Sequence, residues 1–211
     1  MKLIACVAIV LVAVTSASAQ LTPVDWSSTG PGRTASGSAA GITFNMSDFV
    51  ATPLIEDPRY NTGFDYSGAD YSVAPLGSSV NSLLYGGFSD WTLALSQPVP
   101  QLYLYVGAWR GNIWDGQVDP ATNYVFSQPF TIVSGLSGAS TSGNTLTLPD
   151  DVSNGAYYNG ILRFNGPITS VSVDSSMAFN GSLAMTFALP EPSMFAAAIG
   201  AMAAGMLRRR R

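Results

Sequence analysis

The part of the sequence best suited to binding chemistry runs from Trp109 to Asp119 and reads WRGNIWDGQVD. Its two tryptophans, Trp109 and Trp114, could stack on the C–H faces of sugar rings while neighbouring polar groups hydrogen-bond the sugar hydroxyls. The polar side chains available for this are Arg110, Asn112 and Asp115. The alternative interpretation is packing: one tryptophan closes the end of a β-domain, and Asp115-Gly116 forms a turn.

The residue types that the sequence lacks exclude several classes of catalysis. The chain has no histidine, its single cysteine is Cys6, and its single lysine is Lys2. A Ser-His-Asp triad is therefore excluded, and thiol, Schiff-base and common zinc chemistry are excluded once the N-terminal segment is removed. Carboxylate chemistry remains, but neighbouring Glu56 and Asp57 would point to opposite faces of a strand. We expect no enzyme and keep a carboxylate-dependent glycoside hydrolase as a distant alternative.

Two pairs of aspartates could offer oxygen ligands to calcium. They are Asp115 with Asp119 and Asp150 with Asp151. Neither pair follows the Asp-x-Asp/Asn-x-Asp/Asn-Gly spacing of calcium-binding loops. We therefore predict no metal site and no cofactor.

The charge of residues 20–189 limits the partners of the chain. Four arginines stand against twelve carboxylates in this range, which gives a net charge of −8, whereas the whole chain carries −4. Such a surface repels the phosphates of nucleic acid, which proteins bind through clustered lysine and arginine. We predict no nucleic-acid partner, whereas neutral glycans, divalent cations and basic partners remain open.

The elements that must position these residues are predicted to be β-strands. Gly, Ser, Thr, Asn and Asp are abundant, and short apolar-alternating runs recur between turn residues, which is typical of all-β domains. The expected strands are 42–46, 91–95, 102–106, 123–127, 130–133, 145–148, 160–165, 168–173 and 183–189, and Asn165-Gly166-Pro167 is expected to be a tight turn. We favour a hairpin over a mobile leader for 27–41. The pattern predicts an antiparallel two-sheet sandwich or jelly roll.

The N-terminus has the three parts of an export signal. Lys2 precedes an apolar stretch from Leu3 to Val14, and Ala17-Ser18-Ala19 matches the small-x-small cleavage pattern. The sequence therefore predicts a signal peptide over 1–19, a mature chain that begins at Gln20, and a β-sandwich ectodomain over 20–189.

The last 22 residues also have three parts. Pro190, Glu191 and Pro192 precede an apolar run from Ser193 to Leu207, and the chain ends with Arg208, Arg209, Arg210 and Arg211. The apolar run is expected to be a helix that enters a membrane, and the arginines are expected to hold its end on the cytoplasmic side. Its fifteen residues would span roughly 22 Å, against about 30 Å of hydrocarbon. A short helix of this kind suits temporary anchoring better than a permanent anchor.

This tail resembles the PEP-CTERM sorting signal of bacteria that make extracellular polysaccharide. The resemblance covers only residues 190–211, with all three parts in order. It implies recognition by an exosortase, a membrane-embedded enzyme expected to cut near the tripeptide and release the body to the cell surface or matrix. We therefore expect an exported, non-catalytic surface or matrix protein associated with extracellular polysaccharide. The alternative is a carbohydrate-binding module that uses Trp109 and Trp114.

Overall fold

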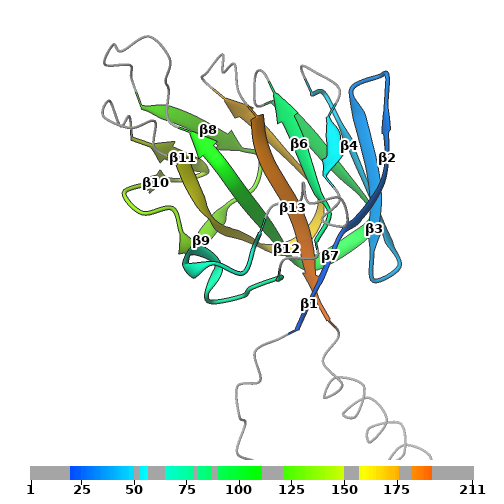
Figure 1. Cartoon of the computed structure of the whole chain (residues 1–211), viewed down its shortest axis with the longest axis horizontal. Coiled ribbons are helices and arrows are strands. Elements are labelled where there is room, and N and C mark those ends of the chain that lie inside the picture. Colours follow the sequence, from blue (N-terminus) through cyan, green and yellow to red (C-terminus); the bar gives the residue numbers. More distant parts are fainter. Residues whose placement is uncertain are drawn as a thin grey trace, which may run out of the picture.

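The computed structural model describes residues 20–49, 53–56, 65–77, 80–86, 90–110, 121–149, 157–175 and 182–191. Thirteen β-strands and one short 3-10 helix make up the regular structure of these ranges (Figure 1). Every strand pairing among them is antiparallel. The prediction of an antiparallel all-β protein is thus confirmed, whereas the signal peptide and the C-terminal helix lie outside the described residues.

The elements have the following bounds in chain order: β1 (Leu21–Pro23), β2 (Asp25–Gly30), β3 (Thr34–Ala39), β4 (Ile42–Ser47), β5 (Leu54–Glu56), η2 (Ala69–Tyr71), β6 (Ser82–Gly86), β7 (Trp91–Arg110), β8 (Thr122–Phe126), β9 (Phe130–Gly135), β10 (Ser140–Ser142), β11 (Thr145–Leu148), β12 (Tyr157–Ser175) and β13 (Ser182–Pro190).

Two long strands, β7 and β12, organise the fold. They pair along almost their full lengths, and the register shifts between Asn165 and Ser170. The first part of β7 pairs with β4 and the last part of β12 pairs with β8, whereas their other parts pair with β13 and β9. The strands therefore form one continuous thirteen-stranded sheet that folds over on itself. The two layers are joined within this sheet, because β7 and β12 are long enough to belong to both.

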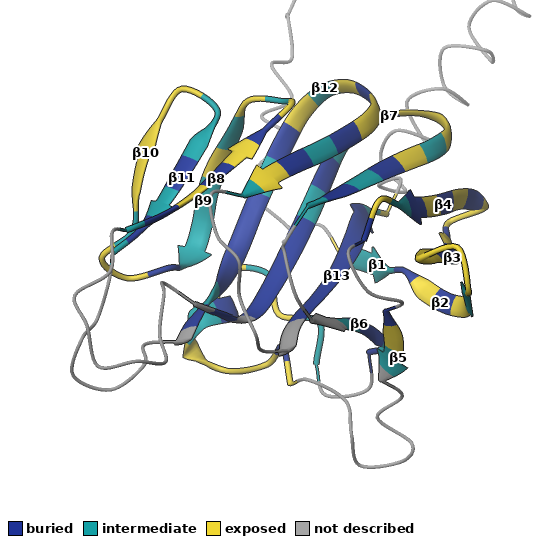
Figure 2. Ribbon diagram, turned by 90° about the horizontal axis from the view of Figure 1, so that it is seen from above, coloured by how far each residue is buried: buried dark blue, intermediate teal, exposed yellow. Residues whose placement is uncertain are grey.

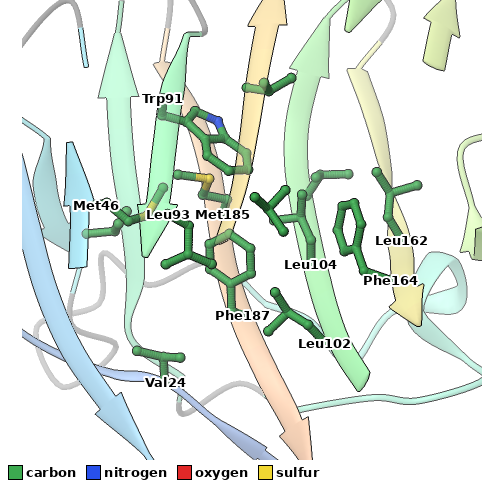
Figure 3. Packing of buried hydrophobic residues seen from close by; sticks show 14 of the residues in the cluster. Val24, Met46, Trp91, Leu93, Leu102, Leu104, Leu162, Phe164, Met185 and Phe187 are labelled. Atoms are coloured by element: carbon green, nitrogen blue, oxygen red, sulfur yellow. The ribbon is translucent and has the colours of Figure 1, made fainter. Parts of the chain in front are cut away.

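The core lies between the two layers and is rich in aromatic rings. Phe187 of β13 lies 5.8 Å from Trp91, 6.3 Å from Phe44 and 6.4 Å from Trp26, measured between ring centroids. Figure 3 shows Phe187 among Met185, Leu93 and Leu104. Burial at alternate positions of β4 and β8 follows from the period of two of a strand, with one face toward this core. Figure 2 shows exposed residues on the outer strands β2 and β10 and at the bends of β7 and β12.

A second, smaller cluster covers the outer face of β7. Tyr105 is fully buried there, with its ring 5.6 Å from Tyr66 and stacked 6.1 Å from Tyr71. The Tyr71 hydroxyl donates to the carbonyl oxygen of Val106 at 2.8 Å, and the Tyr105 hydroxyl donates to the carbonyl oxygen of Ala74. The segment around η2 therefore closes a sheet face that alternation alone would leave in water.

Two turn predictions had opposite outcomes. The preferred hairpin over 27–41 is present as β2 and β3, which pair from Asp25 to Gly30 with a register shift between Trp26 and Ser28. The predicted turn at Asn165-Gly166-Pro167 is wrong, because β12 runs through it. The irregularity there is a register shift against β7 instead, with Gly166 at φ 120°. Pairing with the long strand β7 on both sides keeps these residues within β12, although the same residues would form a turn in a shorter hairpin.

Candidate functional site

The described residues include only part of the predicted sites. Trp109, Gln20, Pro190 and Glu191 are placed, and the backbone of Arg110 ends β7. Outside the described residues lie Ala17, Ala19, Asn112, Trp114, Asp115, Pro192, Arg208, Arg209, Arg210 and Arg211. Of the two tryptophans in the predicted binding segment, Trp109 is the one whose position the structure describes.

Trp109 belongs to the core. Its side chain has no exposed surface, and its ring stacks on Tyr124 of β8 with 4.5 Å between ring centroids and 29° between planes. Its Nε1 has no hydrogen-bond partner among the described residues. Sugar recognition by stacking needs an open ring face, and one face of this ring is already taken by Tyr124. The packing alternative therefore fits the observed position of Trp109.

A shallow hollow of about 440 Å³ lies on the outer face of β2, β3, β4 and β7. Its polar lining includes Ser28, Thr34, Ser36, Asn45 and Ser47, and no charged side chain is among the described residues that line it. Its volume falls in the range of small-ligand sites. The hollow is therefore suited to a neutral, hydroxyl-bearing ligand rather than to an ion.

Strand register builds this hollow. Ser28, Ser36, Asn45 and Ala94 lie opposite one another in a single row across the four strands. The Ser28 and Ser36 hydroxyl oxygens are 2.7 Å apart, within hydrogen-bonding distance. Alternation along 34–38 and 43–47 would have placed these side chains outward, but the order in which strands become neighbours is absent from the sequence. This is why the site was missed.

The start of the tail motif is part of the folded domain. Pro190 is the last residue of β13 and pairs with Leu21 of β1, while Leu189 pairs with Thr22. The backbone N–H of Glu191 donates to the carbonyl oxygen of Gln20 at 2.8 Å. The Thr22 hydroxyl donates to the Glu191 carboxylate at 3.3 Å. Gln20, the residue expected to begin the mature chain, thus lies beside Glu191.

The part of the chain that the structure describes contains neither a metal-binding cluster nor a membrane-spanning helix. There, no three carboxylate, histidine or cysteine side chains gather closely enough to hold a metal ion. No helix in those ranges has the length and apolar character that a membrane crossing needs.

Comparison of the chain with protein-family models, with curated proteins and with solved structures finds no match.

Proposed function

We propose that the chain is an exported, non-catalytic surface or extracellular-matrix protein, sorted through its tail by an exosortase-like enzyme and associated with extracellular polysaccharide. The position of the domain edges is the observation that supports this best. β1 begins at Leu21, one residue after the expected first residue of the mature chain, and β13 ends at Pro190, the first residue of the tripeptide. Removal of both end segments would leave the described core whole.

The folded sheet is, in this proposal, a sandwich-type scaffold. Rings from one layer, such as Trp91 and Phe126, pack on Phe187 and Phe164 of the other layer. Burial of such rings supplies stability without disulfides, because the sequence has no cysteine after Cys6.

Intact mass of the protein in its native host tests the proposal. We expect the form on the outer surface to begin at Gln20 and to end near the tripeptide. Glu191→Ala should leave the full tail in place, because it removes the only charged side chain of the tripeptide Pro190-Glu191-Pro192. Asp174→Ala is the matched control, since Asp174 is an exposed carboxylate on β12 away from the tail, and it should be processed normally. A wild-type chain that keeps residues 1–19 or its tail through Arg211 would contradict the proposal.

A carbohydrate-binding module is the second candidate function, and the hollow over β2, β3, β4 and β7 favours it. The ligand would be a neutral glycan bound through hydroxyl and amide groups rather than through Trp109. Asn45 is the key side chain because its amide can both donate to and accept from a sugar hydroxyl. Asn45 is exposed and lies next to Ser36 in the row of residues across the four strands, so both polar groups of its amide are accessible.

Affinity electrophoresis in gels that contain neutral dextran tests this second candidate. The wild type should be retarded, and Asn45→Ala should lose most of the retardation. Thr43→Ala is the matched control, because Thr43 is exposed on the same strand but does not line the hollow. Equal migration of the wild type and Asn45→Ala in dextran would remove the hollow as a glycan site.

A further inference from the structure

The C-terminal end of β13 is held by a single neighbouring strand. The register of β13 with β7 ends at Ala188, and its register with β6 ends at Met185. Beyond Ala188, the strand partner among the described residues is β1. Figure 1 shows β1 lying beside this end of β13. The first part of the sorting tripeptide is therefore attached to the sheet through three residues at the start of the domain.

The hydrogen-bond ladder between β1 and β13 accommodates two prolines. The N–H of Val24 donates to the carbonyl oxygen of Phe187, and that of Glu191 donates to the carbonyl oxygen of Gln20, both at 2.8 Å. Because bonded and non-bonded pairs alternate in an antiparallel ladder, Thr22 and Leu189 also form a bonded pair. Pro190 and Pro23 then fall at non-bonded positions, where their missing N–H groups cost no ladder bond. The tripeptide begins with a residue that this ladder accepts.

Side chains strengthen the attachment. The Thr22 hydroxyl donates to the Glu191 carboxylate at 3.3 Å. Leu189 is only 3% exposed, and it lines an apolar recess of about 240 Å³ together with Pro190, Ile42 and Val99. Detaching this end of β13 would expose Leu189 and open the recess, in addition to breaking the ladder bonds.

We propose that β1 is a clamp that keeps Pro190 and Glu191 in the folded body, so that tail removal cuts on the C-terminal side of Glu191. The inference rests on the proposed function, because it assumes that the tail is removed. A processing enzyme needs its substrate backbone free, and the backbone up to Glu191 is engaged by β1. The processed body would therefore keep the first two residues of the tripeptide.

The chemistry of the step is ordinary acyl transfer. The bond that breaks is an amide C–N bond whose carbonyl carbon belongs to Glu191 or a later residue. The oxygen of water, or the nitrogen of an acceptor amine, bonds to that carbon, and the departing amine of the tail gains a proton. No change of oxidation state occurs, and intact mass distinguishes the two acceptors.

Hydrogen exchange of the full-length chain in detergent tests the clamp without any processing enzyme. Mass spectrometry at residue resolution should show a protected Glu191 amide in the wild type. Thr22→Pro removes a bonded N–H from the ladder and should speed Glu191 exchange by at least about tenfold. Thr22→Val is the matched variant, because it removes the hydroxyl and keeps the N–H, and it should change the rate by less than about threefold. Equally fast exchange in the wild type and Thr22→Pro would overturn the clamp.

Trp fluorescence and cooperative urea unfolding of Thr22→Pro establish that the core is intact, which is expected because β1 is a short edge strand. In the native host, a processed C-terminus at Glu191 or later is the expected result. A terminus at Leu189 or Pro190 would overturn the inference while leaving the sorting proposal standing. A chain that retains its tail through Arg211 would overturn the proposed function and the cut position together, and the exchange rates would then decide the clamp alone.

Discussion

The backbone N–H of Glu191 donates a hydrogen bond to the carbonyl oxygen of Gln20, with 2.8 Å between nitrogen and oxygen. These residues are 171 positions apart, and each adjoins a predicted processing point. Their contact brings the two edges of the body together on one two-stranded ladder, β1 with β13. A substitution in β1 should therefore weaken the attachment of the end of β13. The core that lies between the two layers allows further tests.

Truncation of Phe187 should strongly destabilise the core. Its ring contacts Trp26, Phe44 and Trp91 from the opposite layer. Phe187→Ala removes these contacts and leaves a cavity, so we expect the free energy of unfolding to fall by about 3–5 kcal/mol. Urea denaturation followed by tryptophan fluorescence measures the loss. Phe187→Leu should cost clearly less, because it fills most of the volume, and equal losses for the two variants would contradict this account.

Trp109 should behave as a core residue. Trp109→Ala removes the ring that stacks on Tyr124 and should lower the free energy of unfolding by about 3–5 kcal/mol. Trp109→Phe keeps an aromatic ring and removes an Nε1 donor that has no partner among the described residues, so it should cost less. Denaturant titrations of both variants check the difference. A folded, fully stable Trp109→Ala would show that the ring is not needed for packing.

Gly135 should not tolerate a side chain. Its φ is +69°, and an added Cβ would lie 2.2 Å from the carbonyl oxygen of Asn159, where β9 meets β12. Gly135→Ala must displace the neighbouring backbone and also hold an alanine at a positive φ. We therefore expect the free energy of unfolding to fall by more than about 2 kcal/mol.

Gly143→Ala is the control for Gly135. Gly143 also has a positive φ, +58°, but nothing lies within 4 Å of an added Cβ. Its cost should be limited to the left-handed backbone penalty of about 1 kcal/mol. Thermal unfolding of both variants separates steric clash from backbone strain, and a similar loss in the two would mean that the clash is relieved without cost.

The cluster that contains Tyr71 of η2 and Tyr105 of β7 should make the free energy of unfolding sensitive to alkaline pH. Burial raises the pKa of Tyr71, with a further contribution from the charges of Asp70 and Asp65, and burial likewise raises the pKa of Tyr105. The unfolded chain releases these phenolic protons near pH 10, while the folded chain keeps them. Their contribution to stability is therefore complete below about pH 10 and declines as pH rises through the folded-state pKa values.

Urea unfolding at about pH 8 and about pH 11 measures this decline. The double variant Tyr71→Phe, Tyr105→Phe cannot ionise at these positions and should show a smaller decline than the wild type. It should also be less stable at the lower pH, because the hydroxyl bonds to the Val106 and Ala74 carbonyls are lost. The same decline in the wild type and the double variant would assign the alkaline effect to other groups.

Local pattern was enough to predict the strands themselves. Period-two alternation at 42–46 and 145–148 corresponds to β4 and β11, because a strand with one buried face must alternate whatever its neighbours are. The exclusion of a Ser-His-Asp triad and the acidic charge also follow from composition alone, since no fold can supply a histidine that the chain lacks. The predicted sorting tail is of the same local kind, and all of its residues except Pro190 and Glu191 lie outside the described residues.

Tertiary structure decided what covers each strand face and which strands become neighbours. Tyr105 alternates as an outward residue, yet it is buried because a segment more than thirty residues earlier folds over it. Asn165-Gly166-Pro167 has turn residues, yet pairing with β7 keeps it within a strand. Strand order decides that Ser36 and Asn45 lie in one row across the sheet. It also decides that Gln20 contacts Glu191. Local sequence sets the direction of a side chain, and only long-range pairing sets what that side chain meets.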